Sequence, residues 1–510
     1  MKRKVILKNA DIITMDEKGT HADSLSIENG KITALGSFSD FSGLIESGVE
    51  VLDLGGMAIV PGFTDCHVHL IMTGISHQQL QLKDARSFDE IFDKIRLWDK
   101  EHPGNDWICG WFVNDTKLKE GRMPEAKDLD RADVDRPVWI LRADGNTSSV
   151  NTQGLQKVIF SIDDFSVIKN GSGKPTGMFK VPSNFAIRFQ ILNSVGPEIK
   201  KKSVEWAAAF AVSRGVTTVH AMEYLEDIPI IQGIINRLPI KVEIYARSDD
   251  PDRILQLGLK TIGGDVLLDG TFPSSTAAIS APYADNKKES GILYYEKRKD
   301  HLLEVMKRAR LEGLQSAFHA IGDRGIGMAL EIFEEVFGKS PETPIRHRIE
   351  HYVLPDSEQI RKTQRLGVYA SMAPAAMINC LEEGTYFKRL GPGRVRSTFP
   401  LREIFDRGVV VGGNSDSPVL EMNPLAGIHT AVNAPYEPQR VKLNEAIKMF
   451  TINGARLGLK EEERGSIDVG KSADLVVLKR NPFSFSQDKI KDIEVMMTFV
   501  DGQIKYNKNR

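Results

Sequence analysis

The distribution of apolar residues predicts an alternation of short strands and helices over most of the chain. Apolar, β-branched runs of strand length lie at 58–65, 217–222, 241–246, 264–268, 315–319, 346–352, 368–372 and 409–414. Segments with helical periodicity separate them, including 203–214, 297–312, 326–337, 357–364 and 401–406. Strands that alternate with helices pair in parallel through βαβ units. Eight such strands match a (β/α)8 TIM barrel, so we expect an α/β fold.

Both ends of the chain have a different pattern, in which apolar and polar residues alternate between turns. Asn29-Gly30 and Asp501-Gly502 are hairpin signals within these segments. Neither end has enough strands to be stable alone. We therefore expect one composite β-sandwich built from the N- and C-terminal segments, residues 1–57 and 463–510, with the barrel, residues 58–462, inserted between its halves.

The stretch after the first predicted barrel strand, residues 71–202, is too long for one βα connection. It contains its own helix at 87–100 and a strand at 137–143. Barrel geometry places such a large insertion over the active-site mouth, because the loops after the strands gather there. Trp111, with Trp107, Trp139 and Arg142, could form an aromatic-walled pocket for a ring-bearing or acidic substrate, and core packing explains these tryptophans at least equally well.

Composition narrows the class of partner. The 510 residues are 41% hydrophobic and 27% charged, and the net charge of -2 gives no reason to expect nucleic acid or an anionic membrane as partner. No apolar run approaches the roughly 20 residues that cross a bilayer, and the N-terminus lacks the apolar core of a signal peptide. Three scattered cysteines disfavour a disulfide framework. We expect a cytoplasmic protein that acts on a small molecule.

Candidate chemistry is densest in the stretch from Ile59 to Leu70, IVPGFTDCHVHL. His67 and His69 are separated by one residue, and on an extended strand such side chains point to the same side. Two neutral imidazoles directed at one point suit a divalent metal. The alternative is an ordinary strand whose histidines meet solvent or a hydrogen-bond partner.

Three further residues of metal-ligand type follow predicted strands. His319 follows QSAF, His351 follows HRIE, and Asp416 follows VVVGGNS. In a TIM barrel the catalytic residues lie at the carboxyl ends of strands. His319 alone could be a core histidine and Asp416 a turn residue, but the joint placement favours a metal site. His220, near the end of the second strand, is a candidate for lining the pocket.

Several motifs resemble those of one known family: VPGFTDCHVHL, FHAIGD, RIEH and NSDSP, with the opening NADIITMD and the close GSIDVGKSADLVVL. They are similar to the amidohydrolase superfamily, and more closely to its branch of N-substituted formamide deformylase-like and AepA-like proteins. The resemblance implies the barrel, the composite sandwich and hydrolysis by a metal-activated water, and it makes a homodimer plausible. It also implies that His67 and His69 bind a more buried metal. His319 and His351 would bind a second one, and Asp416 would be both ligand and proton shuttle.

The sequence also departs from this branch. Where many members have a carboxylated lysine that bridges two metals, this chain has Asp265. The number of metals therefore stays open: two ions bridged by Asp265, or one ion held by His67, His69, Asp416 and, in one version, Asp265. Substrates of the branch are not transferred to this chain, because three positions that are usually His, Gln and Glu are here Asn146, Ala373 and Val181.

The sequence thus predicts a metal-dependent amidohydrolase that acts on C–N bonds other than peptide bonds, with Zn as first choice for its one or two divalent ions. Asp416 would act as general base and then acid on an amide, formamide or cyclic amide. The metal, or His220 or Asn146 at the rim, would polarise the attacked carbonyl. Deamination is a variant of the same chemistry. Two alternatives remain: a metal-dependent lyase or isomerase on the same scaffold, and a non-catalytic binding protein that retains the metal.

Overall fold

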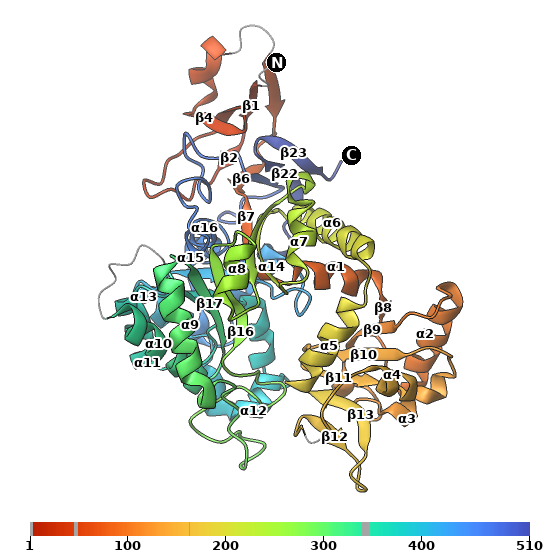
Figure 1. Cartoon of the computed structure of the whole chain (residues 1–510). Coiled ribbons are helices and arrows are strands. Elements are labelled where there is room, and N and C mark those ends of the chain that lie inside the picture. The colour runs from red at the N-terminus through yellow and green to blue at the C-terminus, as the bar shows by residue number, and fades with distance from the viewer. Residues whose placement is uncertain (1–3, 45–48, 163, 339–345, 510) are drawn as a thin grey trace.

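The computed structural model describes residues 4–44, 49–162, 164–338 and 346–509. Within them, parallel strands in two sheets form the centre of the molecule (Figure 1). One sheet has three strands in the order β15-β14-β7, and the other has five in the order β16-β17-β18-β19-β20. Each predicted strand overlaps one of these, whose bounds are β7 Phe63–Val68, β14 Val216–Glu223, β15 Lys241–Ala246, β16 Thr261–Leu267, β17 Gln315–Ala320, β18 Arg348–His351, β19 Tyr369–Met372 and β20 Val411–Gly413.

The two parallel sheets meet at both of their edges, where β15 lies beside β16 and β7 lies beside β20. Between β15 and β16, the Oγ1 of Thr261 donates to the carbonyl of Ile244 at 2.7 Å. On the other side, the amide of Asp416, which follows β20, donates to the carbonyl of His67 in β7 at 3.0 Å. The amide of His69 donates to the carbonyl of Ser417 at 2.9 Å. The carboxyl ends of β7 and β20 are therefore held together.

The start of the first predicted strand, 58–65, is wrong because two strands share this segment. β6 (Ala58–Pro61) pairs with β21 (Leu475–Leu478) in a different sheet, and β7 begins only at Phe63. Gly62 lies between them. A Cβ at this position would lie 2.2 Å from the Oγ1 of Thr217, so the absence of a side chain lets the chain pass this close to β14.

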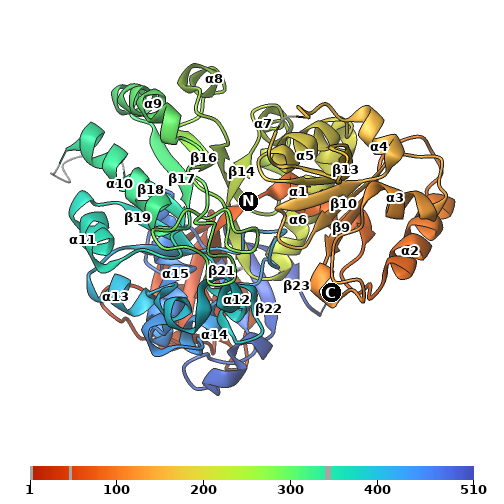
Figure 2. The same cartoon turned by 90° about the horizontal axis from the view of Figure 1, so that it is seen from below.

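Helices pack on the outside of the parallel sheets (Figure 2). The α10 helix buries Ile326, Leu330 and Phe333, whose spacing of four and three residues places them on one stripe. No helix of the described residues is both long and apolar enough to cross a membrane. The helices are α1 Leu70–Gln78, α2 Phe88–Glu101, α3 Ala126–Leu129, α4 Thr152–Lys157, α5 Ser183–Asn193, α6 Pro197–Ser213, α7 Ile228–Gln232, α8 Pro251–Gln256, α9 Lys299–Leu311, α10 Asp323–Phe337, α11 Ser357–Leu366, α12 Thr385–Arg394, α13 Leu401–Asp406, α14 Pro424–Val432, α15 Leu443–Met449 and α16 Ile452–Leu457.

Strands from both ends of the chain share one sheet, in the order β2-β6-β21-β22-β23, beside a second sheet in the order β4-β3-β1-β5. Their apolar side chains form one core, in which Leu7 and Ile27 from the N-terminal segment meet Leu475 and Phe499 from the C-terminal one. This unit lies at the top of Figure 1. The remaining bounds are β1 Lys4–Lys8, β2 Asp11–Ile12, β3 Ser24–Glu28, β4 Lys31–Gly36, β5 Glu50–Asp53, β22 Val495–Val500 and β23 Gln503–Asn507.

The segment after β7 contains a separate sheet of six strands, in the order β12-β13-β11-β10-β9-β8. Ile91 and Ile95 of α2 pack against Ile140 of this sheet in a core of their own. The predicted helix at 87–100 is α2, which Ser87 caps by accepting from the amide of Glu90. The strands are β8 Leu80–Gln81, β9 Ile108–Val113, β10 Val138–Arg142, β11 Thr147–Val150, β12 Val167–Lys169 and β13 Pro175–Lys180.

Candidate metal centre

Buried imidazoles and carboxylates converge where the parallel strands end. His67 lies near the end of β7 and His69 just after it, while His351 is the last residue of β18. Asp265 lies in β16, and Asp416 follows β20. Parallel strands bring their carboxyl ends to one edge, so residues far apart in sequence share this place.

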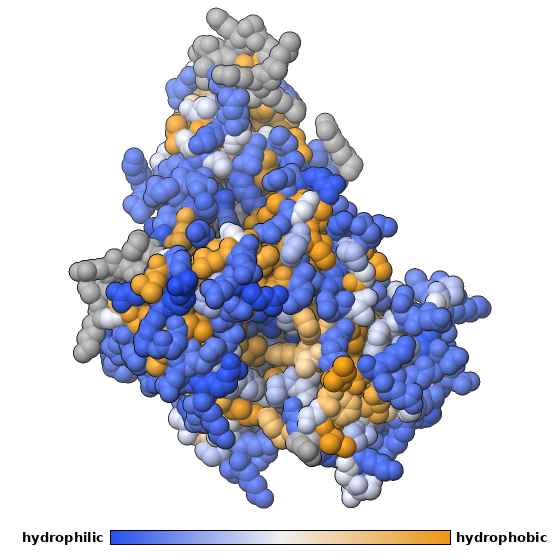
Figure 3. Space-filling model, viewed as in Figure 1, coloured by the Kyte–Doolittle hydropathy of each residue, from blue (hydrophilic) through white to orange (hydrophobic). Residues whose placement is uncertain are grey.

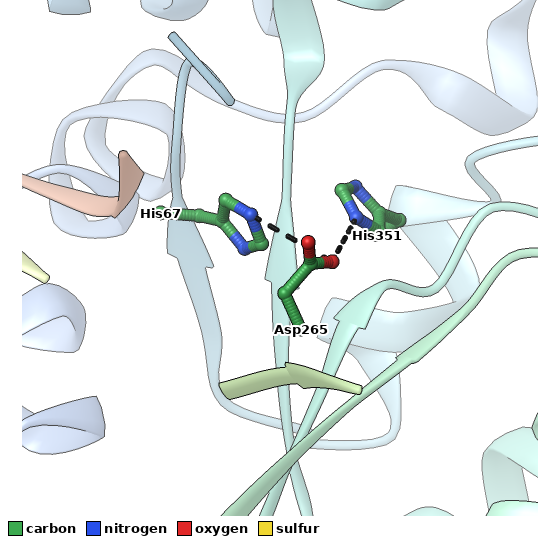
Figure 4. A group of neighbouring side chains, drawn as sticks. All are labelled: His67, Asp265 and His351. Atoms are coloured by element: carbon green, nitrogen blue, oxygen red, sulfur yellow. Dashed lines mark ion pairs between the residues drawn. The ribbon is translucent and has the colours of Figure 1, made fainter. Parts of the chain in front are cut away.

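Three of these residues form the tightest approach. Nε2 of His67 lies 3.4 Å, and Nε2 of His69 3.3 Å, from Oδ1 of Asp416. The three ligand atoms lie within 4.8 Å of one another. A second group of the same kind contains His67, Asp265 and His351, with Oδ1 of Asp265 at 4.0 Å and 3.7 Å from the two Nε2 atoms (Figure 4).

The donor set fits a divalent cation. Nε2 of His67 is buried and has no hydrogen-bond partner among the described residues, although an unpaired buried polar atom is costly. Imidazole nitrogens are borderline ligands and carboxylate oxygens are hard ligands. Together they suit a transition metal or Zn. The two groups share this one nitrogen, which has a single lone pair. They therefore cannot each hold an ion through His67.

The outer nitrogens of His67 and His69 are fixed by other parts of the protein. Nδ1 of His67 lies 2.8 Å from Oε2 of Glu350, and Nδ1 of His69 lies 3.0 Å from the carbonyl oxygen of Met222. A carboxylate or a carbonyl accepts a hydrogen bond from the N–H at Nδ1, so in the neutral form each ring keeps its lone pair on Nε2, toward the centre.

Glu350 is held in turn by a buried arginine. Nε of Arg348 donates to its Oε1 at 2.5 Å and Nη2 donates to its Oε2 at 2.9 Å. Burial raises the pKa of Glu350, but the charge of Arg348 and the hydrogen bond from His67 outweigh it and lower that pKa to about 2. Burial lowers the pKa of His67, and the carboxylates of Glu350 and Asp416 raise it to about 9, so a cation that binds here has to displace a proton from Nε2. Arg348 and Glu350 were not recognised from the sequence.

Asp265 is held by two basic partners. Its Oδ2 lies 3.0 Å from Nη2 of Arg247, and its Oδ1 lies 3.1 Å from Nδ1 of His319. Despite burial, Arg247 and His319 keep the pKa of Asp265 well below its usual range. Arg247, which the sequence did not suggest, thus occupies one of the two oxygens that a metal-bridging carboxylate uses.

His319 lies beside the centre but belongs to neither group of potential ligands. Its Nδ1 faces Asp265, and its Nε2 lies 3.2 Å from the carbonyl oxygen of Gly270. The ring packs edge-on against His351, with centroids 4.4 Å apart. Both nitrogens of His319 therefore have protein partners, in contrast to the orphaned nitrogen of His67.

A cavity of about 340 Å³ opens onto the centre, and His69, Asp265, His351 and Asp416 line its floor. Figure 3 shows the surface hollowed between the insertion and the parallel sheets. The insertion supplies one wall, because residues of the loop after β10 and of α5 line the same cavity. Asn146, predicted to contact substrate, is part of this wall.

Two other residues predicted to contact substrate do not line the cavity. His220 is 1% exposed and lies behind the centre, where its Nδ1 is 2.8 Å from Nη1 of Arg348. Trp111 is fully buried and packs edge-on against Trp139, with ring centroids 5.1 Å apart. Both side chains point into packed interior, and core packing explains Trp111; contact of these two residues with substrate stays a prediction.

Comparison with known proteins gives consistent matches over nearly the whole chain. The model of the amidohydrolase family matches residues 50–506. The putative amidohydrolase YtcJ of Bacillus subtilis is 27% identical over 99% of this chain and 100% of its own length. The N-substituted formamide deformylase of Arthrobacter pascens is 25% identical, with 99% of each chain covered. An uncharacterized metal-dependent hydrolase from Pyrococcus furiosus has a similar structure, with a TM-score of 0.77, 27% identity, and 94% of this chain and 100% of that chain covered.

Proposed function

This chain belongs to the amidohydrolase family, as its motifs predicted, and is a metal-dependent hydrolase; from that premise we propose that it cleaves a C–N bond of a small molecule. The bond is that of an amide, formamide or cyclic amide. One observation carries the proposal. Nε2 of His67, Nε2 of His69 and Oδ1 of Asp416 converge, and His69 and Asp416 line the floor of a cavity that a small molecule can enter.

His67, His69 and Asp416 are the proposed ligands of one catalytic ion. Two imidazoles and one carboxylate, with a position left open, form a ligand set of catalytic Zn sites. Asp265 and His351 would complete the polar floor, where the positively charged Arg247 neutralises Asp265. The single lone pair on Nε2 of His67 lets this ring bind only one ion, and both nitrogens of His319 already have protein partners. These observations favour one ion over two ions, of which His67 and His69 would bind the first and His319 and His351 the second.

Asp416 is the proposed general base and acid. A divalent ion at this centre supplies a Lewis acid that lowers the pKa of water and polarises a carbonyl. The Asp416 side chain is 19% exposed, against 0% for His67 and 8% for Asp265, so it is the carboxylate most open to the cavity. It takes the proton of the attacking water and returns it to the leaving nitrogen. Asn146, which lines the same cavity, orients the carbonyl.

The proposed architecture is a single (β/α)8 barrel spanning residues 58–462, with residues 71–202 inserted over its mouth. It is supported by the parallel order of the strands within each sheet and by the hydrogen bonds between the sheet edges at Thr261 and Asp416. Residues 1–57 and 463–510 would form the composite β-sandwich, supported by the sheet that β6 and β21 share.

The test combines metal analysis with turnover. Purified protein should contain about one equivalent of Zn or a similar ion, and the metal-loaded protein should hydrolyse members of a panel of formamides, amides and cyclic amides. Asp416→Asn should lower kcat by at least about a hundredfold with an unchanged circular dichroism spectrum. Solvent oxygen-18 should appear in the product. Turnover without oxygen-18 would indicate a lyase or isomerase, and unchanged kcat in Asp416→Asn would reject its role.

A further inference from the structure

Arg188, in α5 of the insertion, is a buried cation without a matching anion. Its side chain lines the cavity, and the residue is only 4% exposed. The one hydrogen bond of its guanidinium to the backbone is long, from Nη1 to the carbonyl oxygen of Gly145 at 3.4 Å. Nε has no hydrogen-bond partner among the described residues.

Two other arginines near this cavity are paired. Arg247 lies 3.0 Å from Asp265. Arg142 lies 2.9 Å from Asp115 and 3.3 Å from Asp144, the carboxylate that lines the cavity on this wall. Arg188 forms no such ion pair with any carboxylate of the described residues. Because a buried charge normally has a partner, this arginine is the one that is left to bind a ligand.

Aromatic rings hold the Arg188 side chain in place. Its guanidinium carbon lies 4.5 Å from the ring centroid of Phe185, which also lines the cavity. The hydroxyl of Tyr224 makes a side-chain hydrogen bond with Arg188, and the guanidinium carbon of Arg247 lies 4.7 Å from the centroid of the Tyr224 ring. Stacking on an aromatic face fixes the plane of the guanidinium, and the donors that Gly145 and Tyr224 do not use, Nε among them, remain available to an anion.

We propose that Arg188 binds an anionic group of the substrate, so that this enzyme acts on amides or formamides that carry a carboxylate. The inference rests on the proposed function for the bond that is cleaved, but the anion site itself does not. A carboxylate matches the planar fork of arginine. The substrate also has an apolar part, because the lining of the same cavity includes Met72, Phe185, Leu267, Val353, Tyr386 and Phe399.

The alternative is that Arg188 only joins α5 to the loop at Gly145. A structural role would make the protein less stable without Arg188, but it would give no preference for an anionic ligand. Binding can therefore separate the two explanations without any turnover. The probes are 3-phenylpropanoate and its neutral isostere 4-phenylbutan-2-one, which have the same apolar body and contain no bond that this enzyme hydrolyses.

Calorimetric titration of the metal-loaded protein should show the carboxylate binding at least about tenfold more tightly than the ketone. The ratio of the affinity for the carboxylate to the affinity for the ketone should fall to about one in Arg188→Gln and to an intermediate value in Arg188→Lys. The matched control is Arg136→Gln, because Arg136 is a buried arginine of the insertion that pairs with Asp99 and does not line the cavity. The affinity ratio of this variant should equal that of the unaltered protein.

Equal binding of the two probes to the unaltered protein would overturn the proposal, and this measurement requires no variant to fold. A preference that persists in Arg188→Gln would also overturn it, because the carboxylate would then bind elsewhere, for example at the metal. The two proposals fail separately. An anion preference without any C–N hydrolysis contradicts only the proposed function, while equal kcat/KM for N-formylphenylalanine and N-formylphenylalaninamide contradicts only the role of Arg188.

Discussion

Glu350 determines which nitrogen of His67 is free to bind metal, and its replacement by glutamine tests this directly. The carboxylate accepts from three donors at once. Its Oε2 lies 2.8 Å from Nδ1 of His67 and 2.9 Å from Nη2 of Arg348, and its Oε1 lies 2.5 Å from Nε of Arg348. Glutamine has one acceptor oxygen and one NH2 group, so Glu350→Gln cannot satisfy all three donors.

Either orientation of the glutamine amide weakens metal binding. If its NH2 group faces His67, it donates to Nδ1, and the ring proton moves to Nε2, which removes the lone pair that faces the metal. If its oxygen faces His67, the NH2 group opposes a donor of Arg348, which is fully buried and would lose its anionic partner. Loss of such an outer partner typically costs 10- to 100-fold in metal affinity, or about 1.4–2.7 kcal/mol.

The assay is a competition titration against chelators of graded strength, with bound metal measured by elemental analysis. The matched control is Glu243→Gln, which removes the carboxylate that pairs with Arg464 and touches no candidate metal ligand. We expect weaker binding in Glu350→Gln alone. If the metal affinity of Glu350→Gln equals that of the control, the hydrogen bond to His67 does not set its tautomer, and the reasoning is refuted.

Three further predictions concern stability and the cavity wall. Gly74→Ala should lower Tm, with a loss of about 1–3 kcal/mol, because the new Cβ would lie 2.0 Å from the carbonyl oxygen of Ser203 where α1 crosses α6; an unchanged Tm would contradict this packing. Burial lowers the pKa of His347 from 6.5 to about 3, so below about pH 6.5 the unfolded chain binds a proton that the folded chain does not. Stability should fall from pH 7 to pH 5 by up to about 1.4 kcal/mol per unit, and His347→Gln should flatten the fall in Tm; a parallel fall would refute this assignment. Trp111→Phe should leave KM unchanged, whereas Asn146→Ala should raise it, and the opposite result would return Trp111 to the cavity wall.

The convergence of the polar residues could be predicted from the sequence because it depends on strand order. A residue at the carboxyl end of a parallel strand lies at a known edge of the sheet. His67, His351 and Asp416 therefore required only the correct identification of their strands. The length of the segment after the first strand predicted that it covers this edge, whereas Asn146, which lines the cavity, was singled out by the family motif and not by strand order.

The direction of individual side chains could not be predicted in the same way. Every residue of β14 is buried, so alternation of polar and apolar residues does not tell which face of this strand meets the cavity. His220 was assigned to the pocket for its position near the strand end, while its ring faces Arg348. Arg348 and Glu350 are two residues apart on β18, and this pair of opposite charges on one side of a buried strand was the available signal for the support of His67.

Backbone conformation explains why the pattern of the strands did not predict the orientation of the site residues. Asp265, His351 and Asp416 have φ values of 61°, 69° and 52°, in the left-handed region that non-glycine residues rarely adopt. Such a residue turns its side chain away from the two-residue period of the strand. Each costs of order 1–3 kcal/mol, which is large against a typical stability of about 5–15 kcal/mol.

The surroundings must therefore impose these conformations, and for Asp265 the ion pair with Arg247 and the hydrogen bond with His319 do so. This affects how substitutions at the site are interpreted. Asp265→Ala removes the carboxylate and also places a residue with no local polar stabilisation at positive φ. Asp265→Asn keeps a side chain that tolerates this region and removes only the charge. The difference between the two variants in unfolding free energy measures the backbone contribution, and the metal affinity of Asp265→Asn measures what the carboxylate adds to the centre.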